Sequence, residues 1–384
     1  MVLPCKLSHF FLWLALAIAG AGCAVRVTVP APLATMSDDL EVASLRAAIG
    51  HSLNYLQRLP PGQVVGEQPR PFTAGEIADS LIAFSELLDH WHCRECLARR
   101  IAAQFELVAS SAEPQQAEVL FTGYYQPVIE ASLTPSEEYR YPIYALPSDL
   151  IAQQLDGEKR LGRIENDVLV PYYSRREIDQ LGVLRGRDLE IAWVKDPIDL
   201  FFLHIQGSGL LRLADGREVT VGYAGQSGLA YRSIGRLLID TGKVPKEEMS
   251  MQRLRRYLID YPAEQNEIFA YNESYVFFRL SEDGPFGSLG VPVTAGRSMA
   301  TDSRLFPRGA LALAQTDIPI VGASGELAGW RPMMRFVLNQ DTGGAIRGPQ
   351  RADYYFGTGE TAGALAGYMN RQGRLYFLVL KNKR

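Results

Sequence analysis

Short apolar runs separated by glycine-rich turns occupy the chain from Phe121 to its end, and they limit the fold more than any other feature. Runs of this length form strands, and the glycines and prolines between them form tight turns. With 35 glycines and 22 prolines, the chain has enough turn residues for many such strands. The pattern predicts a mainly β fold containing a small barrel. The expected strands lie in a hairpin at 210–225 and at 273–280, 291–296, 310–321, 334–340, 352–357 and 374–381.

Helices are predicted mainly in the first third of the chain. Residues 73–90 begin with Thr73 and Glu76, which have the spacing of a capping box, and carry apolar side chains at helical intervals. Residues 97–110 continue with the same period. Both segments are interpreted as scaffold. Two further helices are expected at 231–242 and 246–262.

Composition and charge narrow the function. With 47% hydrophobic and 21% charged residues, the 384-residue chain is globular and long enough for two domains. Its formal net charge of −4 offers no broad cationic surface, which argues against a nucleic-acid partner. The sequence contains no GxSxG, HExxH or phosphate-binding loop motif, and its 5 histidines are scattered. Serine-dependent or metal-dependent hydrolysis is therefore poorly supported, and no cofactor is expected.

The N-terminus is a targeting segment. A lysine, a short apolar run and small residues lead to Cys23, and the run is too short to span a bilayer. The small residues before the cysteine resemble a bacterial lipobox that lacks its usual leucine. We expect a signal peptide at 1–22, acylation of Cys23 and a lipidated tether at 23–40, with an ordinary cleaved signal peptide as the alternative. Because Ala24 follows the cysteine, the resemblance implies an outer-membrane lipoprotein facing the periplasm of a Gram-negative bacterium.

A second pair of cysteines, Cys93 and Cys96, lies beside His90 and His92. These four side chains could bind zinc, but no second CxxC pair or distant histidine cluster completes such a site. The alternatives are a disulfide, which an exported location permits, or two buried thiols. The sequence favours these alternatives over a metal site.

Three aspartates, Asp302, Asp341 and Asp353, are the candidates for catalysis. They lie far apart in sequence, but the strands of a barrel could bring them together. Glycines after Asp341 permit close backbone approach, and aromatic residues after Asp353 would exclude water and favour its protonated form. The alternative is that Asp302 and Asp341 are turn or cap residues with local hydrogen bonds. That alternative is weaker for Asp353, which lies in a strand-like run.

Polar and aromatic side chains suited to a polysaccharide occur in three glycine-containing segments. Tyr124 and Tyr125 could stack on pyranose rings. Gln206 and Ser208, expected to follow a hydrophobic strand, could bind sugar hydroxyls, as could Gln226. Core packing is the alternative for the tyrosines, and a plain glycine turn is the alternative for the segment that contains Gln206.

Several segments taken together resemble the membrane-bound lytic murein transglycosylase A family. They run in order from residue 121 and include FTGYYQPVIEASL, WVKDPIDLFFLHIQGSGLLRL, VGYAGQSGLAYRSIGRLLID, GPFGSLGVPVTAGRSMATD and DTGGAIRGPQRADYYFGTG. The resemblance implies a double-psi β-barrel formed by residues 41–136 and 284–384, with a second β-barrel inserted at 137–283. A groove between the two barrels would hold a glycan strand. The C-terminal part resembles the three-aspartate domain, which is named for residues that align with the three aspartates above.

The same resemblance implies a lytic transglycosylase, which cleaves the β-1,4 bond between N-acetylmuramic acid and N-acetylglucosamine and leaves a 1,6-anhydro end. The muramyl C6 hydroxyl is the nucleophile, so one carboxyl suffices, first as acid and then as base. The family pattern gives this role to Asp353, with Asp341 shaping the local field or turn and Asp302 as structural support. The expected substrate contacts are Tyr124, Tyr125, Gln206, Ser208, Gly209, Gln226, Tyr354 and Thr358.

Two other functions compete with this one. A muramidase-type hydrolase would pair Asp353 with Asp341 or Asp302 and use water as the nucleophile. A non-catalytic peptidoglycan-binding lipoprotein would use the same groove for binding alone. In each case the expected partners are murein glycan strands and, through the lipid anchor, the outer membrane. Cell-wall synthesis or scaffold proteins are further candidates.

Overall fold

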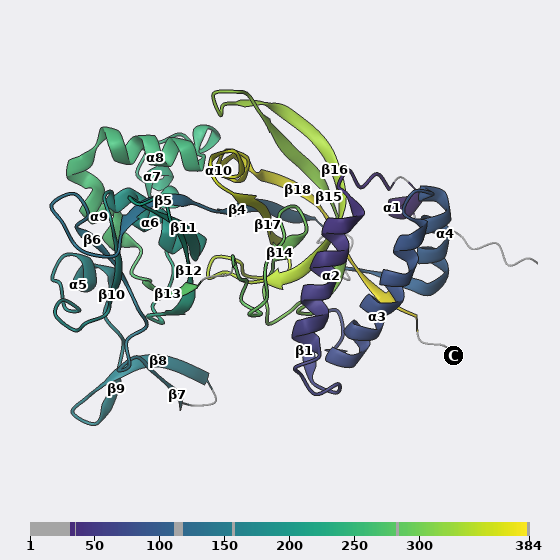
Figure 1. Cartoon of the computed structure of the whole chain (residues 1–384), viewed down its shortest axis with the longest axis horizontal. Helices are drawn as coiled ribbons and strands as arrows, with labels where there is room; N and C mark the ends of the chain where they lie inside the picture. The colour runs from purple at the N-terminus through teal and green to yellow at the C-terminus, as the bar shows by residue number, and fades with distance from the viewer. Residues whose placement is uncertain (1–30, 35, 111–117, 156–157, 282–283, 382–384) are drawn as a thin grey trace, which may run out of the picture.

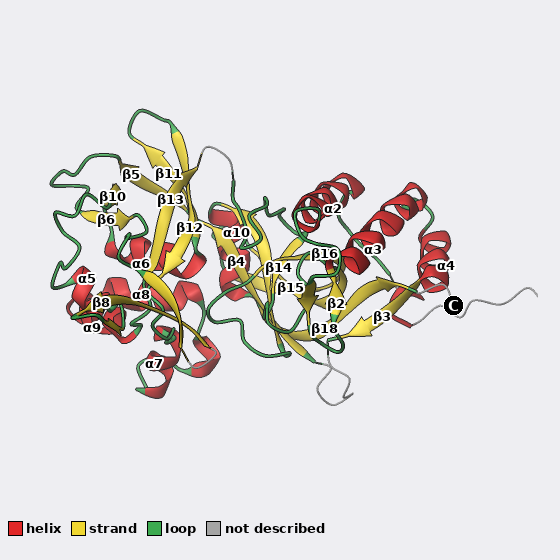
Figure 2. Cartoon of the chain, turned by 90° about the horizontal axis from the view of Figure 1, so that it is seen from below, coloured by secondary structure: helices red, strands yellow, loops and turns green. Residues whose placement is uncertain are grey.

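The chain folds around two curled β-sheets with helices on their outer sides (Figures 1 and 2). The predicted signal peptide, Cys23 included, lies outside the part of the chain that is described. None of the described helices is long and apolar enough to cross a bilayer. This computed structural model describes residues 31–34, 36–110, 118–155, 158–281 and 284–381.

The first sheet is a closed barrel. Its strand order is β15-β16-β14-β17-β4-β18, and pairing between β15 and β18 returns the sheet to its start, while β3 extends the outer edge of β18. The barrel therefore joins segments from both halves of the chain, which confirms a mainly β fold with a barrel. Its strands are β3 (Phe105–Ala109), β4 (Val119–Gln126), β14 (Ser298–Ala300), β15 (Leu311–Val321), β16 (Leu327–Asp341), β17 (Arg351–Thr358) and β18 (Asn370–Leu380).

The second sheet belongs to the inserted domain and has the order β13-β12-β11-β5-β10-β6. A bridge between Ala145 and Phe278 brings the end of β6 back to β13, so this sheet also curls toward a barrel. The chain leaves the first barrel at Pro127, ahead of the predicted boundary at residue 137, because β5 already pairs in parallel with β11. The strands are β5 (Val128–Ser132), β6 (Tyr141–Tyr144), β10 (Glu190–Val194), β11 (Ser208–Leu213), β12 (Glu218–Gln226) and β13 (Val276–Ser281).

Helices and a small arm complete the inserted domain (Figure 1). Apolar residues of α6 such as Phe201 and Phe202 pack against α7, α8 and α9 in a separate cluster of buried side chains. The helices are α5 (Arg175–Asp179), α6 (Pro197–Gln206), α7 (Ile234–Asp240), α8 (Met251–Asp260) and α9 (Gln265–Tyr271). The arm, which projects from the domain, consists of β7 (Ile151–Leu155), β8 (Glu158–Glu165) and β9 (Val168–Val170).

An N-terminal helical layer covers one side of the first barrel (Figure 2). Thr73 caps α3 by accepting a hydrogen bond from the Glu76 amide, and Phe84 of this helix packs edge-on against Phe336 of β16. A buried ion pair between Asp38 and Arg297 fixes the segment before the helices to the barrel. The remaining elements are α1 (Ala31–Ala34), α2 (Val42–Leu56), α3 (Ala74–Leu87), α4 (Arg94–Gln104), α10 (Glu360–Tyr368) and the short strands β1 (Val64–Gly66) and β2 (Phe72–Thr73).

Three predicted elements differ from the structure. The helix expected at 97–110 ends at Gln104, because the next residues form β3 and pair with β18. The run before Gln206 is helix α6 instead of a strand; Asp196 caps it and Pro197 opens it, so these two local signals outweigh the apolar run. The expected strand at 291–296 is loop and turn with one isolated bridge, and the strand β14 begins after it.

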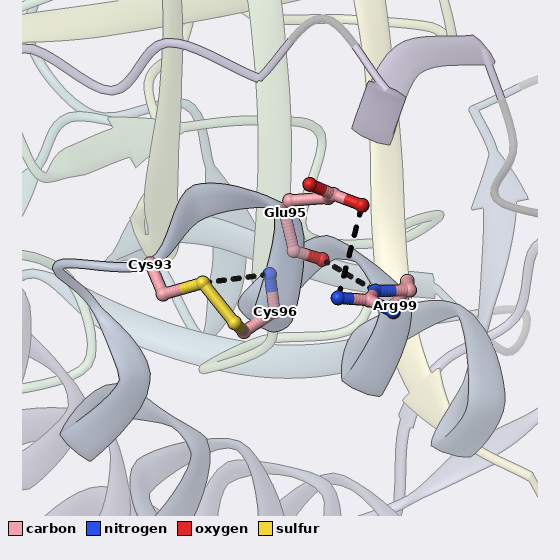
Figure 3. The surroundings of a disulfide bond; sticks show 4 residues. All are labelled: Cys93, Glu95, Cys96 and Arg99. Carbon is pink, nitrogen blue, oxygen red and sulfur yellow. Dashed lines mark hydrogen bonds and ion pairs between the residues drawn. A yellow bond between two sulfur atoms is a disulfide. The ribbon is translucent and has the colours of Figure 1, made fainter.

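The CxxC pair is a disulfide at the start of α4 (Figure 3). The Cys93 sulfur caps the helix by accepting from the Cys96 amide, with 3.3 Å between the two atoms. Among the described residues, no group of three or more His, Cys, Asp or Glu side chains is arranged to hold a metal ion. Of the alternatives left open by the sequence, the disulfide is therefore the one that forms.

Candidate active site

A cavity of about 490 Å³ lies between the two barrels. Its walls come from β4, β16 and β17 of the first barrel and from α6, β11, β12 and β13 of the inserted domain. The predicted groove between two barrels is thus present as a hollow that reaches both domains. The first-barrel lining includes Tyr124, Asp341 and Asp353, and the inserted-domain lining includes Gln206, Ser208, Tyr223, Gln226 and Arg279.

Asp353 lies in the middle of β17, between β14 and β4. Its Oδ1 accepts a hydrogen bond of 2.8 Å from the Thr122 hydroxyl of the neighbouring strand. Arg351 is two residues away on the same face and donates to the same hydroxyl at 3.2 Å. The three side chains form a short connected row along one face of the barrel wall.

Burial raises the pKa of Asp353 to about 6. The neighbouring Asp341 carboxylate adds to this rise, whereas the Thr122 hydrogen bond and the Arg351 charge oppose it. Since burial is the largest cause, the carboxyl keeps its proton to a pH at which an ordinary aspartate has lost it. A carboxyl in this state can donate a proton near neutral pH and take one back.

Asp341 is the last residue of β16 and lines the same cavity. Its Oδ1 accepts from the amides of Ser288 and Thr342, each at 2.8 Å. Burial raises the pKa of Asp341 in spite of these hydrogen bonds. The same burial, with the charges of the two carboxylates, raises the pKa of Tyr124 well above its usual value, so its hydroxyl stays protonated beside them.

Asp302 is separate from this pair. Its side chain is completely buried. Its Oδ2 lies 2.7 Å from Nη2 of Arg304 and accepts a hydrogen bond of 2.9 Å from the Gly348 amide. Burial alone would raise its pKa, but the Arg304 guanidinium and the backbone amides hold the pKa at about 2. Asp302 is therefore charged at neutral pH, and its contact with the Gly348 amide fixes the loop before β17.

Of the eight predicted substrate contacts, four line the cavity: Tyr124, Gln206, Ser208 and Gln226. Gln206 also joins the two domains, because its Oε1 accepts from the Tyr125 amide at 3.0 Å and its Nε2 lies 3.8 Å from the Met251 sulfur. Both ends of this amide are thus engaged, and Gln206 forms a fixed wall of the cavity.

The other four do not line this cavity. Tyr354 is fully buried on the opposite face of β17, where its hydroxyl donates to the Gly296 carbonyl and accepts from Arg335. Tyr125 points away from Tyr124, so that its ring packs on α10, where a Cβ at Gly363 would come within 2.8 Å of it. Adjacent strand residues face opposite sides, which accounts for both cases.

Gly209 and Thr358 have local structural roles. A Cβ at Gly209 would lie 2.6 Å from the Leu203 side chain, so the glycine lets α6 pack closely on β11. The Thr358 hydroxyl donates to the Gln126 side chain at 2.8 Å. Neither residue belongs to the cavity wall.

Several residues of the site escaped the sequence reasoning. Tyr223, whose side chain is 45% exposed, and Phe286 bring aromatic surfaces to the cavity, and Arg279 brings a positive charge. Tyr223 lies in the same GYAGQSG segment as Gln226, so the sequence could have indicated its aromatic ring as a sugar contact. Nothing in the sequence indicated Thr122 as a site residue, since only the pairing of β4 with β17 brings it to Asp353.

Comparison with known proteins gives consistent results. The MltA specific insert domain matches residues 120–279, and the 3D domain matches residues 297–379. Membrane-bound lytic murein transglycosylase A of Vibrio cholerae is 34% identical over 285 residues, which cover 73% of this chain and 71% of that protein. The protein of the same name from Escherichia coli K12 is 37% identical over 263 residues, covering 68% of this chain and 65%, just under two thirds, of the relative.

Solved structures resemble nearly the whole chain. A membrane-bound lytic murein transglycosylase from Agrobacterium tumefaciens superimposes with a TM-score of 0.75 at 32% identity, covering 89% of this chain and 93% of that one. E. coli MltA with bound chitohexaose gives a TM-score of 0.67 at 28% identity, covering 91% and 93% of the two chains. The two-barrel arrangement is therefore shared with these proteins.

Proposed function

Since this chain belongs to the membrane-bound lytic murein transglycosylase A family, we propose that it cleaves murein glycan strands without water. The bond broken is the β-1,4 link between N-acetylmuramic acid and N-acetylglucosamine, and the product carries a 1,6-anhydro ring. The observation that carries the proposal is a partly buried carboxyl, Asp353, whose pKa is raised to about 6 in a cavity between two barrels. The related E. coli structure with chitohexaose supports a glycan as the ligand of such a cavity.

The chemistry needs one group that can give and then take a proton. Asp353 protonates the glycosidic oxygen, the C1–O bond breaks, and positive charge develops on the muramyl C1 and its ring oxygen. The muramyl C6 hydroxyl then attacks C1, and the Asp353 carboxylate accepts the proton of that hydroxyl. Acid–base help of this kind contributes on the order of 10²–10⁴-fold in rate. The nucleophile is part of the substrate, so no second carboxyl is required to activate water.

Neighbouring groups support this cycle. The negative potential of Asp341 raises the pKa of Asp353 and would favour the developing positive charge on the sugar. Thr122 holds one oxygen of Asp353, which leaves the other for the glycosidic oxygen. The Tyr223 and Phe286 rings offer apolar faces for pyranose rings, and Gln226 offers an amide group for hydroxyls, whereas the engaged amide of Gln206 fixes the wall.

We propose that the protein acts on the periplasmic side of a membrane, and the membrane-bound relatives support this location. Anchoring to the outer membrane through acylated Cys23 is part of the proposal, as is contact with cell-wall synthesis or scaffold proteins. Helix α1, which follows the segment that would carry the anchor, lies on the far side of the first barrel from the inserted domain (Figure 1). Such an anchor would leave the cavity free to receive a strand.

Digestion of purified sacculi in water enriched in heavy oxygen tests the reaction. Because the C6 hydroxyl is the nucleophile, mass spectrometry should find anhydro ends without the label. Labelled reducing ends would instead identify a muramidase that pairs Asp353 with Asp341. Protein that sediments with murein but releases no soluble fragments would be a binding protein only. The Asp353→Asn variant, digested in parallel, controls for contaminating hydrolases.

A further inference from the structure

A second cavity, of about 680 Å³, lies inside the inserted domain. Its volume is in the range of small-molecule sites, roughly 300–1,000 Å³. None of its lining residues lines the candidate active site. A single layer of side chains separates the two cavities, because His204 borders the first and its Nδ1 lies 3.3 Å from the guanidinium of Arg175, which borders the second.

The floor of this cavity contains a buried guanidinium. The Arg175 side chain is only 2% exposed, and its carbon is 4.9 Å from the Phe201 ring centre and 5.0 Å from the Tyr275 ring centre. Its Nε donates to the Asn272 carbonyl at 3.0 Å, and one Nη donates to the Ser274 carbonyl at 2.7 Å. The backbone thus fixes the guanidinium rigidly, with its remaining nitrogen directed to Asp179.

Asp179 compensates this charge only loosely. The closest approach between its carboxylate and Arg175 is 3.6 Å, longer than a hydrogen bond. The Asp179 side chain remains 33% exposed and borders the cavity, so it can accept a further donor from a ligand. A buried charged pair with such imperfect contact is costly unless another group completes it.

Further charges surround the opening. Arg140, Arg185 and Glu190 border the cavity, and none of them forms an ion pair with another described residue. The half-buried rings of Tyr141 and Trp193 provide apolar walls between these charges. The site therefore offers two carboxylates, the guanidinium groups of Arg185 and Arg140, and two aromatic rings within one hollow; the Arg140 guanidinium lies over the Tyr141 ring, 5.6 Å from its centre.

This combination selects among ligand classes. A neutral sugar would leave the charges unpaired, which is costly for groups removed from water. A polyanion would be repelled by Asp179 and Glu190, and a polyamine by the arginines. A short peptide that carries both carboxylates and a free ammonium group satisfies all of them, and the aromatic walls suit its aliphatic chain.

We propose that this cavity of the inserted domain binds the peptide stems of murein, with Glu190 and Asp179 holding the ammonium group of a diamino acid and Arg185 and Arg140 holding its carboxylates. The inference rests on the proposed function, since a murein strand presents such stems beside the glycan. Binding here would select strands that carry peptides over bare glycans, without any contribution to the chemistry at Asp353.

Calorimetric titration of the purified protein with N-acetyl-L-Ala-γ-D-Glu-meso-diaminopimelate, whose capped alanine leaves the diaminopimelate amine as its one free amine, tests the proposal. The Asp353→Asn variant is titrated alongside, so that binding is measured apart from turnover. We expect one site per chain, with binding weakened about tenfold or more by Glu190→Gln and by Arg185→Gln, as for loss of one charged contact. The matched controls Glu86→Gln in α3 and Arg217→Gln in the turn between β11 and β12 remove exposed charges that do not line the cavity, and these variants should bind normally.

Modified peptides show which charged group of the peptide each protein side chain binds. Acetylation of the diaminopimelate amine should weaken binding to the wild-type protein more than binding to Glu190→Gln, in which one of the two carboxylates that hold this amine is already lost. Replacement of diaminopimelate by lysine, which removes one carboxylate, should likewise weaken binding to Arg185→Gln less than binding to the wild-type protein. No heat up to about 10 mM peptide, equal binding by all variants, or displacement of the peptide by chitohexaose would overturn the proposal. If anhydro ends still form in that event, only this inference fails; if none form, the proposed reaction fails independently.

Discussion

Two aspartates of the same barrel, Asp353 and Asp302, have pKa values moved in opposite directions, to about 6 and about 2. Both lie away from bulk water, so burial favours the neutral form in each case. The difference comes from their partners. Asp302 holds a guanidinium at 2.7 Å and a backbone amide at 2.9 Å, whereas Asp353 accepts a neutral hydroxyl and faces a second acid.

The comparison shows how one fold makes a structural acid and a reactive acid from the same side chain. Arg304 is two residues from Asp302 and donates directly to its carboxylate, which keeps Asp302 charged. Arg351 occupies the equivalent spacing from Asp353, but it donates to Thr122 and reaches the carboxylate only through that hydroxyl. A carboxyl that must exchange its proton is thus kept from direct contact with a cation.

The largest expected effect concerns turnover. Asp353→Asn should lower the rate of anhydro-muropeptide release by at least about 100-fold, because the proton donor is lost, while glycan binding is kept. Asp302→Asn should leave the rate of the folded protein within a few-fold and lower its stability by about 1–3 kcal/mol, because the contacts to Arg304 and Gly348 weaken. Release of anhydro-muropeptides measures turnover, and titration with chitohexaose measures glycan binding. Urea unfolding measures the stability of Asp302→Asn.

Equal losses of activity in the two folded variants would show that the two sites are not distinct. Arg304→Gln is a suitable control, since it removes the partner of Asp302 and leaves the aspartate in place. Its stability should fall in the same direction as that of Asp302→Asn, with turnover retained.

The second prediction concerns the pH dependence of stability. The folded pKa of Asp353, about 6, exceeds the ordinary value of 3.8, so its contribution is fully present below about pH 4 and is lost as the pH rises through 6. A difference of about two pKa units corresponds to about 3 kcal/mol. The folded pKa of Asp302, about 2, lies below the ordinary value, so its contribution is present above about pH 4 and is lost as the pH falls through 2.

Unfolding free energies of the wild-type protein and of each asparagine variant, measured between about pH 3 and pH 8, check these opposite signs. Asp353→Asn should remove a decline in stability between pH 4 and pH 6. Asp302→Asn should instead remove a rise that occurs at the acid end of the range. If the unfolding free energies of the wild-type protein and of Asp353→Asn changed equally between pH 4 and pH 6, the raised pKa of Asp353 would be contradicted.

The sequence was sufficient to place the reactive carboxyl on a strand but not to orient its neighbours. The apolar run around Asp353 predicts a strand at 352–357, and β17 covers it. Strand alternation alone would have placed Tyr354 on the face opposite Asp353, so that error was avoidable. The hydrogen bond from Thr122 was not predictable in this way, because it joins residues 231 positions apart and depends on the register of two parallel strands.

Helix α6 shows the other limit of sequence reasoning. Its residues 198–205 are nearly all apolar and mostly buried, because the helix is enclosed between the second sheet and α7 to α9. A helix buried on all sides has no polar face, so its run cannot be distinguished from a strand by periodicity. The capping residue Asp196 and the following Pro197 were the informative signals. Gln206 lies at the helix end, and therefore in the cavity wall, because Gly207 closes the helix in the left-handed conformation.

The smallest expected effect tests the link between Thr122 and Asp353. The Thr122 hydrogen bond stabilises the charged carboxylate and lowers the pKa of Asp353, so Thr122→Val should raise that pKa, by up to about one unit. Since the reaction begins with the protonated carboxyl, the alkaline limb of the pH–rate profile should move to higher pH. Thr316→Val, which removes a buried hydroxyl bonded to the Gln372 carbonyl outside the cavity, is the matched control and should leave the profile in place. An unmoved or acid-shifted limb in Thr122→Val would mean that the hydroxyl does not tune Asp353, and that burial and the Asp341 charge alone separate this carboxyl from Asp302.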